Sequence, residues 1–358
     1  MNDGTNPKID ILDLDMKELS AWLTAQGIKP FHAKQIFKWV FCSQEDTFSG
    51  MTDLSKALRS SLDQWFFISR LTSVKTEYSS DGTRKYLLQL KDGHHIETVL
   101  IPESDHYTLC ISTQVGCAQG CRFCLTASGG FIRNLSRAEI IAQVRDVQKD
   151  LSRDAPRLTN IVIMGMGEPL ANYRNVVSAI NTLVDGDFGL KFSSRRLTLS
   201  TVGLVPRLYD LGRDTAVNLA VSLNATDNKT RDMLMPVNRN YPVEKLIEAC
   251  RTYPLKPRRR ITFEYILIKG VNDGVEDAHR LAKLLRPIKA KINLIPFNEH
   301  EGCDFQRPEE SVILKFQDIL ANNNFTAMIR YSKGGDISAA CGQLRARLKK
   351  ADFKLSDA

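Results

Sequence analysis

Short apolar segments alternate with amphipathic segments along the chain from about residue 105 onward. The apolar runs are short enough for strands, and the segments between them place apolar residues at helical spacing. We expect strands over residues 159–165, 195–201, 217–223, 261–268 and 291–297. We expect helices over residues 138–147, 175–184, 243–251 and 278–286. Ser136 and Glu139 stand at the spacing of a capping box just before the first helix.

Repeated strand–helix units of this kind predict an α/β fold with a parallel sheet. About six or seven units fit into the chain, which is short of a full eight-unit barrel. Ligands in such folds bind at the carboxyl ends of the strands. Functional side chains are therefore expected at those ends.

The first hundred residues follow different patterns. Residues 1–70 have the spacing of helices, and Gly27 and Pro30 divide the run MKELSAWLTAQGIKPFHAKQIFKWVF into two of them. Residues 71–102 alternate as strands do, because KYLLQLKDG ends in an Asp-Gly turn and HHIETVLIP resumes the alternation. We expect a small N-terminal helical domain followed by a β-extension.

Composition limits the class of protein without identifying its activity. The 358 residues are 43% hydrophobic and 25% charged, which is ordinary for a globular chain. Lys and Arg outnumber Asp and Glu by 49 to 41, and the net charge of +8 is compatible with an RNA partner. The polar N-terminus and the lack of a long apolar run predict a cytoplasmic protein without a membrane span. In that compartment, cysteines of this chain are expected to serve as ligands or catalysts rather than to form structural disulfides.

Three cysteines, Cys117, Cys121 and Cys124, form a C-x3-C-x2-C motif in QVGCAQGCRFCLTASGGF. A closed zinc site or an all-cysteine iron–sulfur cluster uses four protein ligands. Three cysteines suit a [4Fe–4S] cluster with one open iron. This spacing resembles that of radical S-adenosylmethionine (SAM) enzymes, in which SAM binds the open iron. The alternative is a zinc knuckle completed by a nearby histidine, of which the candidates are His94, His95 and His106.

Other candidate ligands follow the predicted strands. Gly165-Met166-Gly167-Glu168-Pro169 comes after the first strand, where a glycine pair lets a ligand approach the backbone and Glu168 offers an acceptor. Polar residues end later strands in a pattern that predicts one cofactor pocket. These residues are Ser200, Ser222 with Leu223 and Asn224, and Asn298. The alternative for each is a plain turn or a helix cap.

Two further cysteines stand apart from the motif. Cys110 lies seven residues before it, and Cys341 follows Gly334-Gly335-Asp336 near the C-terminus. For Cys42, Cys250 and Cys303 we expect the usual state of a buried, inert thiol.

Basic residues form three clusters that suit either phosphate contacts or a solvated surface. The clusters are Lys256 with Arg258, Arg259 and Arg260; Arg195 with Arg196; and Arg345, Arg347, Lys349 and Lys350.

Taken together, these segments resemble the RlmN-type RNA adenine C2-methyltransferases of the radical SAM superfamily. The likeness covers nearly the whole chain. It is carried by FHAKQIFKWVF, MTDLSKALR, HHIETVLIPESDHYTLCISTQVGC, CRFCLTASGGFIRNL, MGMGEPLANY, RRLTLSTVG, KINLIPFN and GGDISAACGQL.

The resemblance implies a partial (β/α)6-type radical SAM barrel. The implied domains are an RNA-binding accessory domain (1–70), a β-extension (71–102), a radical SAM core (103–335) and a C-terminal segment with a methyl-accepting cysteine (336–358). The implied cofactors are a [4Fe–4S] cluster and SAM. The implied partners are 23S rRNA, tRNA and an electron donor such as flavodoxin or ferredoxin, and the chain is expected to be a monomer.

The resemblance also implies residue roles. Cys117, Cys121 and Cys124 would hold the cluster, and Cys341 would receive a methyl group from SAM. A radical derived from a second SAM would activate that methyl group, which then joins adenine C2. Glu97 would remove the C2 proton. Cys110 would attack the Cys341 sulfur, forming a disulfide and releasing the methylated RNA.

One comparison within the family, one departure from it and two alternatives complete the prediction. Glu168-Pro169 and Phe131-x-Arg133-Asn134 resemble the C2-specific group rather than the related Cfr type, which methylates C8. Asn224 stands where the family commonly has His, which leaves one SAM contact open. The alternatives of another class are a non-catalytic, metal-containing RNA-binding protein and a radical SAM enzyme that acts on proteins or small molecules.

Overall fold

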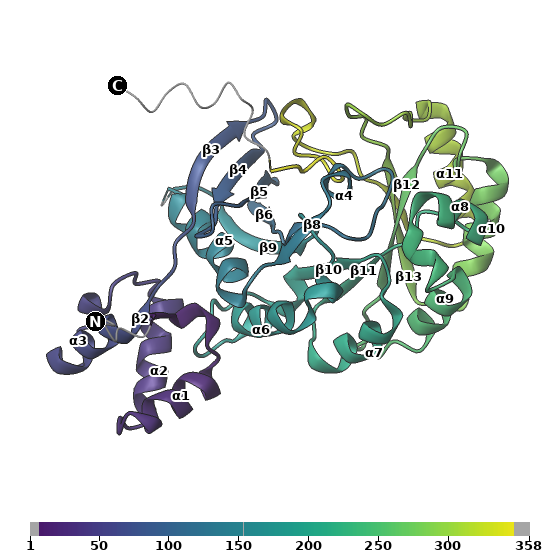
Figure 1. Ribbon diagram of the computed structural model, residues 1–358. Helices are drawn as coiled ribbons and strands as arrows, with labels where there is room; N and C mark the ends of the chain where they lie inside the picture. The colour runs from purple at the N-terminus through teal and green to yellow at the C-terminus, as the bar shows by residue number, and fades with distance from the viewer. Residues whose placement is uncertain (1–6, 153, 347–358) are drawn as a thin grey trace, which may run out of the picture. The chain divides into compact units, whose positions relative to one another are not determined.

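A computed structural model of the protein describes residues 7–152 and 154–346 (Figure 1). Its helices are α1 (Met16–Ala25), α2 (Phe31–Phe37), α3 (Lys56–Trp65), α4 (Leu125–Ser128), α5 (Arg137–Asp150), α6 (Tyr173–Val184), α7 (Val205–Asp214), α8 (Asn228–Leu234), α9 (Val243–Arg251), α10 (Val275–Leu285) and α11 (Glu310–Asn322). Its strands are β1 (Ile9–Asp10), β2 (Phe66–Phe67), β3 (Thr72–Tyr78), β4 (Arg84–Gln89), β5 (His95–Pro102), β6 (His106–Cys110), β7 (Gln114–Gly116), β8 (Phe131–Asn134), β9 (Arg157–Ile163), β10 (Leu197–Thr201), β11 (Asn218–Ser222), β12 (Ile261–Leu267), β13 (Ala290–Pro296) and β14 (Ala327–Ile329).

The main sheet of the described residues has ten strands in the order β14-β13-β12-β11-β10-β9-β6-β5-β4-β3. From β6 to β14 all neighbours are parallel, and helices connect the successive parallel strands along the chain. From β3 to β6 the neighbours are antiparallel. The α/β prediction and its six or seven units are confirmed. The predicted β-extension is part of the same sheet rather than a separate layer.

Burial explains why the parallel strands read as apolar runs. A strand covered on both faces lacks the alternation of a half-exposed one. In β12 every residue except Ile266 is buried, and Glu264 is the one charged residue among them. The sequence ITFEYIL therefore contains a buried carboxylate that needs partners.

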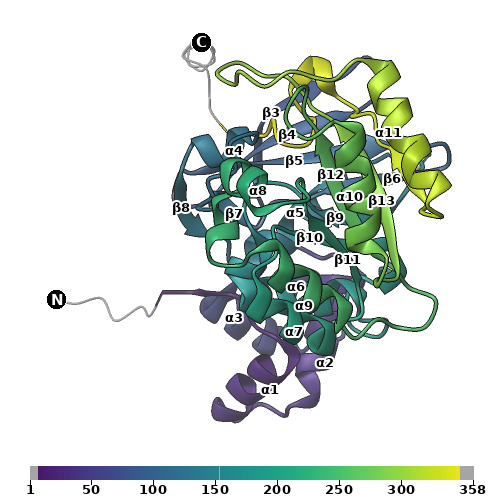
Figure 2. The same cartoon turned by 90° about the vertical axis from the view of Figure 1, so that its right-hand side faces the viewer.

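The helices that follow β10 to β13 pack through one apolar stripe each. In α10 the buried residues are Ala278, Leu281, Ala282 and Leu285, at the spacing of a single helix face. Figure 2 shows these green helices along the outer side of the curved sheet. The cap predicted for α5 is confirmed, because Ser136 Oγ accepts from Glu139 N (3.2 Å) and Ser136 N donates to Glu139 Oε2 (2.9 Å).

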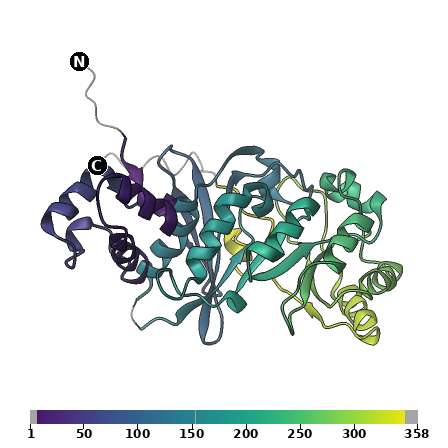
Figure 3. The ribbon, with the colours of Figure 1, turned by 90° about the horizontal axis from the view of Figure 1, so that it is seen from below.

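The chain divides into two compact units. One comprises residues 1–71, 135–155 and 174–194, and the other comprises residues 72–134, 156–173 and 195–358. In the first unit the purple N-terminal helices gather together (Figure 3). Within it, Arg145 is fully buried and pairs with Asp46 at 3.0 Å, which ties α5 to the N-terminal segment. In the described part of the chain, no helix is long and apolar enough to cross a membrane.

Candidate active site

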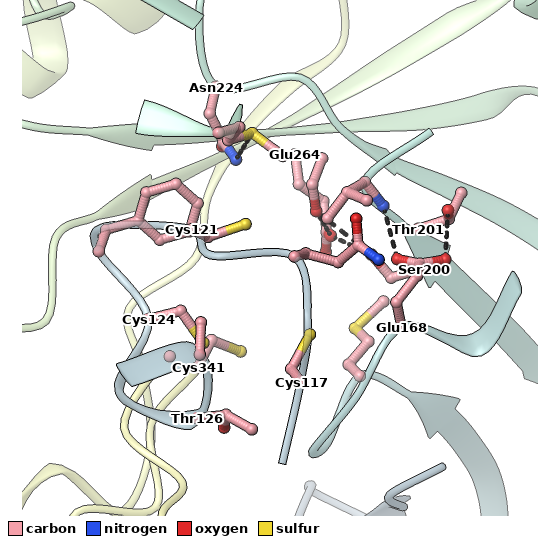
Figure 4. A pocket seen from close by; sticks show the side chains of 18 of the residues that line it. Cys117, Cys121, Cys124, Thr126, Glu168, Ser200, Thr201, Asn224, Glu264 and Cys341 are labelled. Atoms are coloured by element: carbon pink, nitrogen blue, oxygen red, sulfur yellow. Dashed lines mark hydrogen bonds between the residues drawn. The ribbon is translucent and has the colours of Figure 1, made fainter. Parts of the chain in front are cut away.

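A cavity opens at the carboxyl ends of the parallel strands, within the larger unit (Figure 4). Many of the predicted site residues border it, although they lie up to about two hundred residues apart in the sequence. Those that line it are Cys117, Cys121, Cys124, Gly167, Glu168, Ser200, Ser222, Asn224 and Cys341. Glu97, Cys110, Leu223 and Asn298 lie outside its lining, and each is described below.

The loop after β7 carries the three motif cysteines. Its entry is fixed at Gly116, where φ is +74° and a Cβ would lie 1.9 Å from the Gly130 oxygen, so only glycine fits. Cys117 N donates to Gly130 O (2.8 Å), and Cys124 N donates to Cys121 O (3.1 Å). The sulfurs of the three cysteines face a common space (Figure 4).

The donor set fits an iron–sulfur cluster. Three buried or half-buried thiols face one cavity, and thiolate is the ligand of such clusters. Burial raises the pKa of Cys117 to about 12 and that of Cys121 well above its ordinary value, with the Cys124 charge adding to both. Metal binding therefore has to displace protons from these thiols. Among the described residues, no three His, Cys, Asp or Glu side chains are arranged to hold a single ion.

Cys341 faces the same cavity from the C-terminal segment, close to Cys124 (Figure 4). The residue is exposed toward the cavity, yet the surrounding protein raises its pKa to about 11, with further contributions from Glu264 and Cys124. The segment is fixed to the cysteine loop just after this residue, because Leu125 N donates to Gly342 O (2.7 Å). Asn298, which was predicted to contact the cofactor, instead donates to the Cys341 carbonyl oxygen (3.1 Å).

The other side of the Cys341 segment is fixed to the β3–β4 hairpin. Asp336 accepts from Ser79 Oγ (2.6 Å) and from Ser80 N (3.1 Å). The ammonium of Lys85 donates to Ile337 O at 2.6 Å. The predicted β-extension thus holds the segment that presents Cys341.

Glu97 in β5 is buried, with an exposed fraction of 5%. Its Oε1 pairs with Lys85 Nζ at 3.4 Å, and its Oε2 accepts from Arg345 N at 2.7 Å. Burial raises the pKa of Glu97, and the Lys85 charge opposes that rise. The carboxylate therefore contacts the Cys341 segment through Arg345 rather than lining the cavity. The remaining members of the predicted C-terminal basic cluster, Arg347, Lys349 and Lys350, lie outside the described residues.

Cys110 is the last residue of β6 and is buried, with an exposed fraction of 7%. Burial raises the pKa of its thiol, and the nearby Cys341 thiol adds to the effect. Cys110 does not line the cavity. All eight cysteines lie within the described residues, and none forms a disulfide. Cys250 is buried as predicted, but Cys42 is exposed and Cys303 is half-buried, so the buried state predicted for these two is wrong.

The glycine pair after β9 is required by the packing of the protein itself. A Cβ on Gly167, where φ is +102°, would lie 2.5 Å from the Gln114 side chain, and one on Gly165 would lie 2.7 Å from Ile111 O. The space next to these glycines, which was predicted to admit a ligand, is therefore already occupied by Gln114 and Ile111 of the protein itself. Both glycines still border the cavity.

Glu168 is 2% exposed, and both of its carboxylate oxygens have protein partners. Oε1 accepts from Thr201 Oγ1 (2.6 Å) and Leu170 N (3.0 Å), and Oε2 accepts from Val202 N (2.9 Å). Burial raises its pKa and these donors oppose the rise. Glu168 therefore joins the ends of β9 and β10 at the cavity wall.

Ser200 and Ser222 reach the cavity together with a residue that the sequence analysis missed. Both hydroxyls donate to Glu264 Oε2, Ser200 at 2.6 Å and Ser222 at 3.2 Å. Glu264 Oε1 has no hydrogen-bond partner among the described residues. Burial raises the pKa of Glu264, and the two serines oppose it. The signal in the sequence was a lone carboxylate inside an apolar strand.

Asn224 adopts a left-handed conformation with φ of 58°, which asparagine tolerates better than most residues. Its Oδ1 accepts from Ile266 N (2.9 Å), and its Nδ2 lies 3.3 Å from Met235 Sδ. Its neighbour Leu223 is fully buried and donates its N–H to Glu264 O (3.0 Å). Asn224 therefore joins β11 to β12 in addition to lining the cavity.

Arg231 in α8 is a second residue that sequence reasoning missed. It is fully buried, and its guanidinium donates to Leu223 O (3.0 Å), Val202 O (2.8 Å) and Asn238 Oδ1 (3.0 Å). Burial lowers its pKa to about 10. This buried cation therefore supplies hydrogen-bond donors to backbone carbonyl groups at the strand ends, where the sheet itself provides none.

Two protein families match parts of this chain, and several known proteins are similar to nearly all of it. Residues 9–68 match the family described as the ribosomal RNA large subunit methyltransferase N-terminal domain, and residues 111–284 match the radical SAM superfamily. The chain is 60% identical over 350 residues to the dual-specificity RNA methyltransferase RlmN of Desulfosudis oleivorans, covering 98% of this chain and 94% of the relative. It is 52% identical to the protein of the same name from Geotalea uraniireducens, covering 96% and 98%.

A solved structure shares the fold. The crystal structure of a radical SAM methyltransferase from Sphaerobacter thermophilus matches with a TM-score of 0.89 and 44% identity, over 95% of this chain and 100% of the other. The barrel, the cysteine motif and the N-terminal helices all fall within these matches. The chain therefore belongs to the RlmN family of radical SAM RNA methyltransferases, which use a [4Fe–4S] cluster and SAM.

Proposed function

We propose that this protein methylates C2 of one adenine in 23S rRNA and of one adenine in tRNA. The observation that carries the proposal is the cavity that brings Cys117, Cys121 and Cys124 together with Cys341. The name of the relatives, dual-specificity RNA methyltransferase, supports more than one RNA substrate.

The cofactors and the protein divide the chemistry. When bound, the cluster and SAM supply a methyl group and a radical that removes a hydrogen atom from it. Cys117, Cys121 and Cys124 would hold the cluster. Glu168, Ser200, Ser222 and Asn224 would shape the SAM pocket, with Glu264 offering its open oxygen. Gly167 and Leu223 would position these groups through the backbone, and the Asn298 side chain would position Cys341.

Cys341 would carry the methyl group to the substrate. Its position on a segment held at both sides supports this role, because the sulfur must reach adenine C2 in a defined geometry. A carbon–carbon bond would form between adenine C2 and the carrier carbon, which has lost one hydrogen atom, and would link the protein to the RNA. The surplus electron of this adduct would return to the cofactors that supplied the radical.

Glu97 and Cys110 would then release the product. Glu97 would accept the proton from C2, and the adjacent Lys85 would keep its carboxylate ionised. Cys110 would attack the Cys341 sulfur, so the sulfur–carbon bond breaks as a disulfide forms and the methylated adenine leaves. A reductant of the thiol class would restore both thiols.

The remaining expectations concern organisation and partners. We propose that residues 1–70 form an RNA-binding accessory domain, residues 71–102 an extension, residues 103–335 the catalytic core and residues 336–358 the carrier segment. We also propose a monomer in the cytoplasm, reduced by a flavodoxin or ferredoxin.

An in vitro assay tests the proposal. Anaerobically reconstituted protein, SAM, a reductant and unmodified 23S rRNA or tRNA are incubated, and the digested RNA is examined by mass spectrometry. We expect C2-methyladenosine from both RNAs. Methylation at C8 would show a Cfr-type specificity instead, and methylation of neither RNA would refute the proposal.

A further inference from the structure

A second pocket lies at the opposite edge of the parallel sheet from the cavity. It is lined by five cationic side chains, Arg258, Arg259, Arg260, Arg286 and Lys289, and by uncharged residues that precede β13 and β14. No carboxylate is among its lining residues. The pocket therefore gathers positive charge at the amino ends of the strands.

Four of these cations are available to a ligand. Arg258, Arg260, Arg286 and Lys289 are exposed, and none of them forms an ion pair with a carboxylate of the described residues. Arg260 makes one neutral contact, from Nη1 to Thr326 Oγ1 at 3.0 Å. Elsewhere in this unit, surface arginines such as Arg213 and Arg251 are paired with acidic residues of their own helices.

The positive charge continues along the same edge. Strand order places the starts of β9, β10, β11, β12 and β13 side by side. Arg157 begins β9, and Arg195 and Arg196 directly precede β10. Asn218 at the start of β11 joins the two groups, because its Nδ2 donates to Arg195 O (2.8 Å) and its Oδ1 accepts from Arg259 Nη1 (3.0 Å).

The row spans five neighbouring strands, or about 19 Å at the usual strand spacing. Two basic clusters that are some sixty residues apart in the sequence thus form one surface. Lys291 lies in β13, next to this surface. Burial lowers its pKa, and the charges of Arg330 and Arg260 lower it further.

We propose that this cationic row, formed by Arg157, Arg195, Arg196, Arg258–Arg260, Arg286 and Lys289, binds the phosphate backbone of the substrate RNA away from the methylated adenine. The inference rests on the proposed function, because it takes RNA as the ligand. The row consists of cationic side chains, and its pocket is lined by a single aromatic residue, Phe325, so it suits phosphates rather than a stack of bases. Binding there adds affinity that is independent of sequence and falls steeply with salt.

The position of the row favours RNA over an acidic electron-donor protein. An electron donor has to approach the cysteine motif, which is at the carboxyl edge, about 20 Å from the row at the rise of a seven-residue strand. An RNA substrate is a polymer that extends far beyond its reacting base. It can therefore occupy both edges of the sheet at once.

Salt-dependent RNA binding tests the proposal. A synthetic RNA hairpin without adenine in its loop is titrated with the cluster-containing full chain, and anisotropy is followed at several salt concentrations. The variant R258Q/R260Q/R286Q/K289Q should bind at least about tenfold more weakly. The slope of log affinity against log salt should become shallower by about three, since each lost phosphate contact removes roughly 0.7 to 0.9.

A control variant separates position from net charge. The variant R213Q/R251Q/K269Q/R307Q also removes four positive charges, so both variants change the net charge from +8 to +4. Its four residues are paired with carboxylates in the structure and lie outside the row. It should change RNA affinity less than about twofold.

Three results would overturn the proposal: equal weakening in both variants, unchanged RNA binding in the row variant, or a loss in that variant confined to binding of flavodoxin or ferredoxin. Thermal melting and iron content exclude loss of folding, and the half-variants R258Q/R260Q and R286Q/K289Q should each give about half of the slope change. Failure of the proposed function looks different. In that case the wild type binds the hairpin through the row but methylates neither RNA.

Discussion

Polar side chains at the strand ends are buried at the carboxyl edge of the parallel sheet and exposed at its amino edge. At the carboxyl edge, Glu168, Ser200 and Glu264 are buried and hydrogen-bonded to one another or to backbone groups of neighbouring strands. At the amino edge, Arg258 and Arg286 are exposed and have no acidic partner in the described part of the chain. A reaction requires fixed groups in a dry space, whereas a polymer of phosphates requires accessible charge.

This difference predicts two kinds of mutational response. Loss of a buried group at the carboxyl edge should stop one step of the reaction, because no neighbour replaces it. Loss of one exposed cation should weaken binding by a small step, because the others remain. Experiments on the two edges should therefore separate chemistry from RNA affinity.

The largest effect is expected at the cysteine motif. Replacing Cys117, Cys121 or Cys124 by Ala should reduce the iron content from about four per chain to near zero, because the cluster loses a thiolate ligand. Methylation should vanish, while affinity for the RNA hairpin stays within about twofold. Iron analysis and anisotropy measure both. Tight zinc in place of iron in the wild type, after anaerobic purification, would contradict the cluster.

Loss of the carrier thiol should be equally complete for methyl transfer, but it should spare the cluster. Cys341→Ala should retain iron and bind SAM, yet leave RNA unmethylated, because on the proposed mechanism its sulfur would carry the methyl group. Peptide mass spectrometry should find an additional methyl group on Cys341 of the active wild type. Full activity in the variant would exclude Cys341 as the carrier. Cys42→Ala, at an exposed thiol of the other unit, is the matched control.

Loss of Cys110 should stop the reaction one step later. Cys110→Ala should form the covalent protein–RNA link through Cys341 but fail to release it, because the attacking thiol is absent. A denaturing gel with and without ribonuclease detects the adduct. If Cys110 only fills space, the variant should lose roughly one kcal/mol of stability and keep its turnover.

A smaller effect is expected at Lys85, which pairs with Glu97. Lys85→Met removes the charge that opposes the burial-induced rise in the Glu97 pKa, so that pKa should rise further. Because a base acts in its ionised form, the acidic limb of the rate profile should move to higher pH. Lys75→Met, at a more exposed ion pair with Glu77, should leave the profile in place. An unshifted limb in Lys85→Met would argue against Glu97 as the base.

The smallest effect is expected for one cation of the amino edge. Arg286→Gln should weaken hairpin binding by about twofold to fivefold and make the salt slope shallower by about one. Turnover at saturating RNA should not change, since the cavity is untouched. A changed iron content in this variant would contradict the expectation that the amino edge can be altered without affecting the cluster at the carboxyl edge.

Much of the fold could be predicted because burial leaves a direct trace in the sequence. The five apolar runs after residue 105 correspond to β9 to β13, and the cysteine spacing predicted that Cys117, Cys121 and Cys124 face one cavity. Ser200 and Ser222 were predicted to lie together because the carboxyl ends of parallel strands meet at one edge. These inferences need only local patterns and the rule for parallel sheets.

The partners of individual side chains could not be predicted in this way. Glu264 meets Ser200 and Ser222 only through the register of three strands, which the sequence does not display. Asn298 bonds to the Cys341 carbonyl, and Glu97 to the Arg345 amide, across more than forty residues. Arg231 was missed because a lone arginine on a short helix looks like surface charge until its burial is known.

The two attachments of the Cys341 segment have a kinetic consequence. Lys85 holds Ile337 and Leu125 holds Gly342, so only the four residues 338–341 lie between fixed points. Such a short tether extends to roughly 14 Å at most. It confines the sulfur of Cys341 to a small volume, which raises its effective concentration toward any group that borders that volume. On the proposed mechanism, Cys110 should therefore outcompete dissolved thiols for the linked intermediate, and lengthening the tether should let small thiols from solution cleave it.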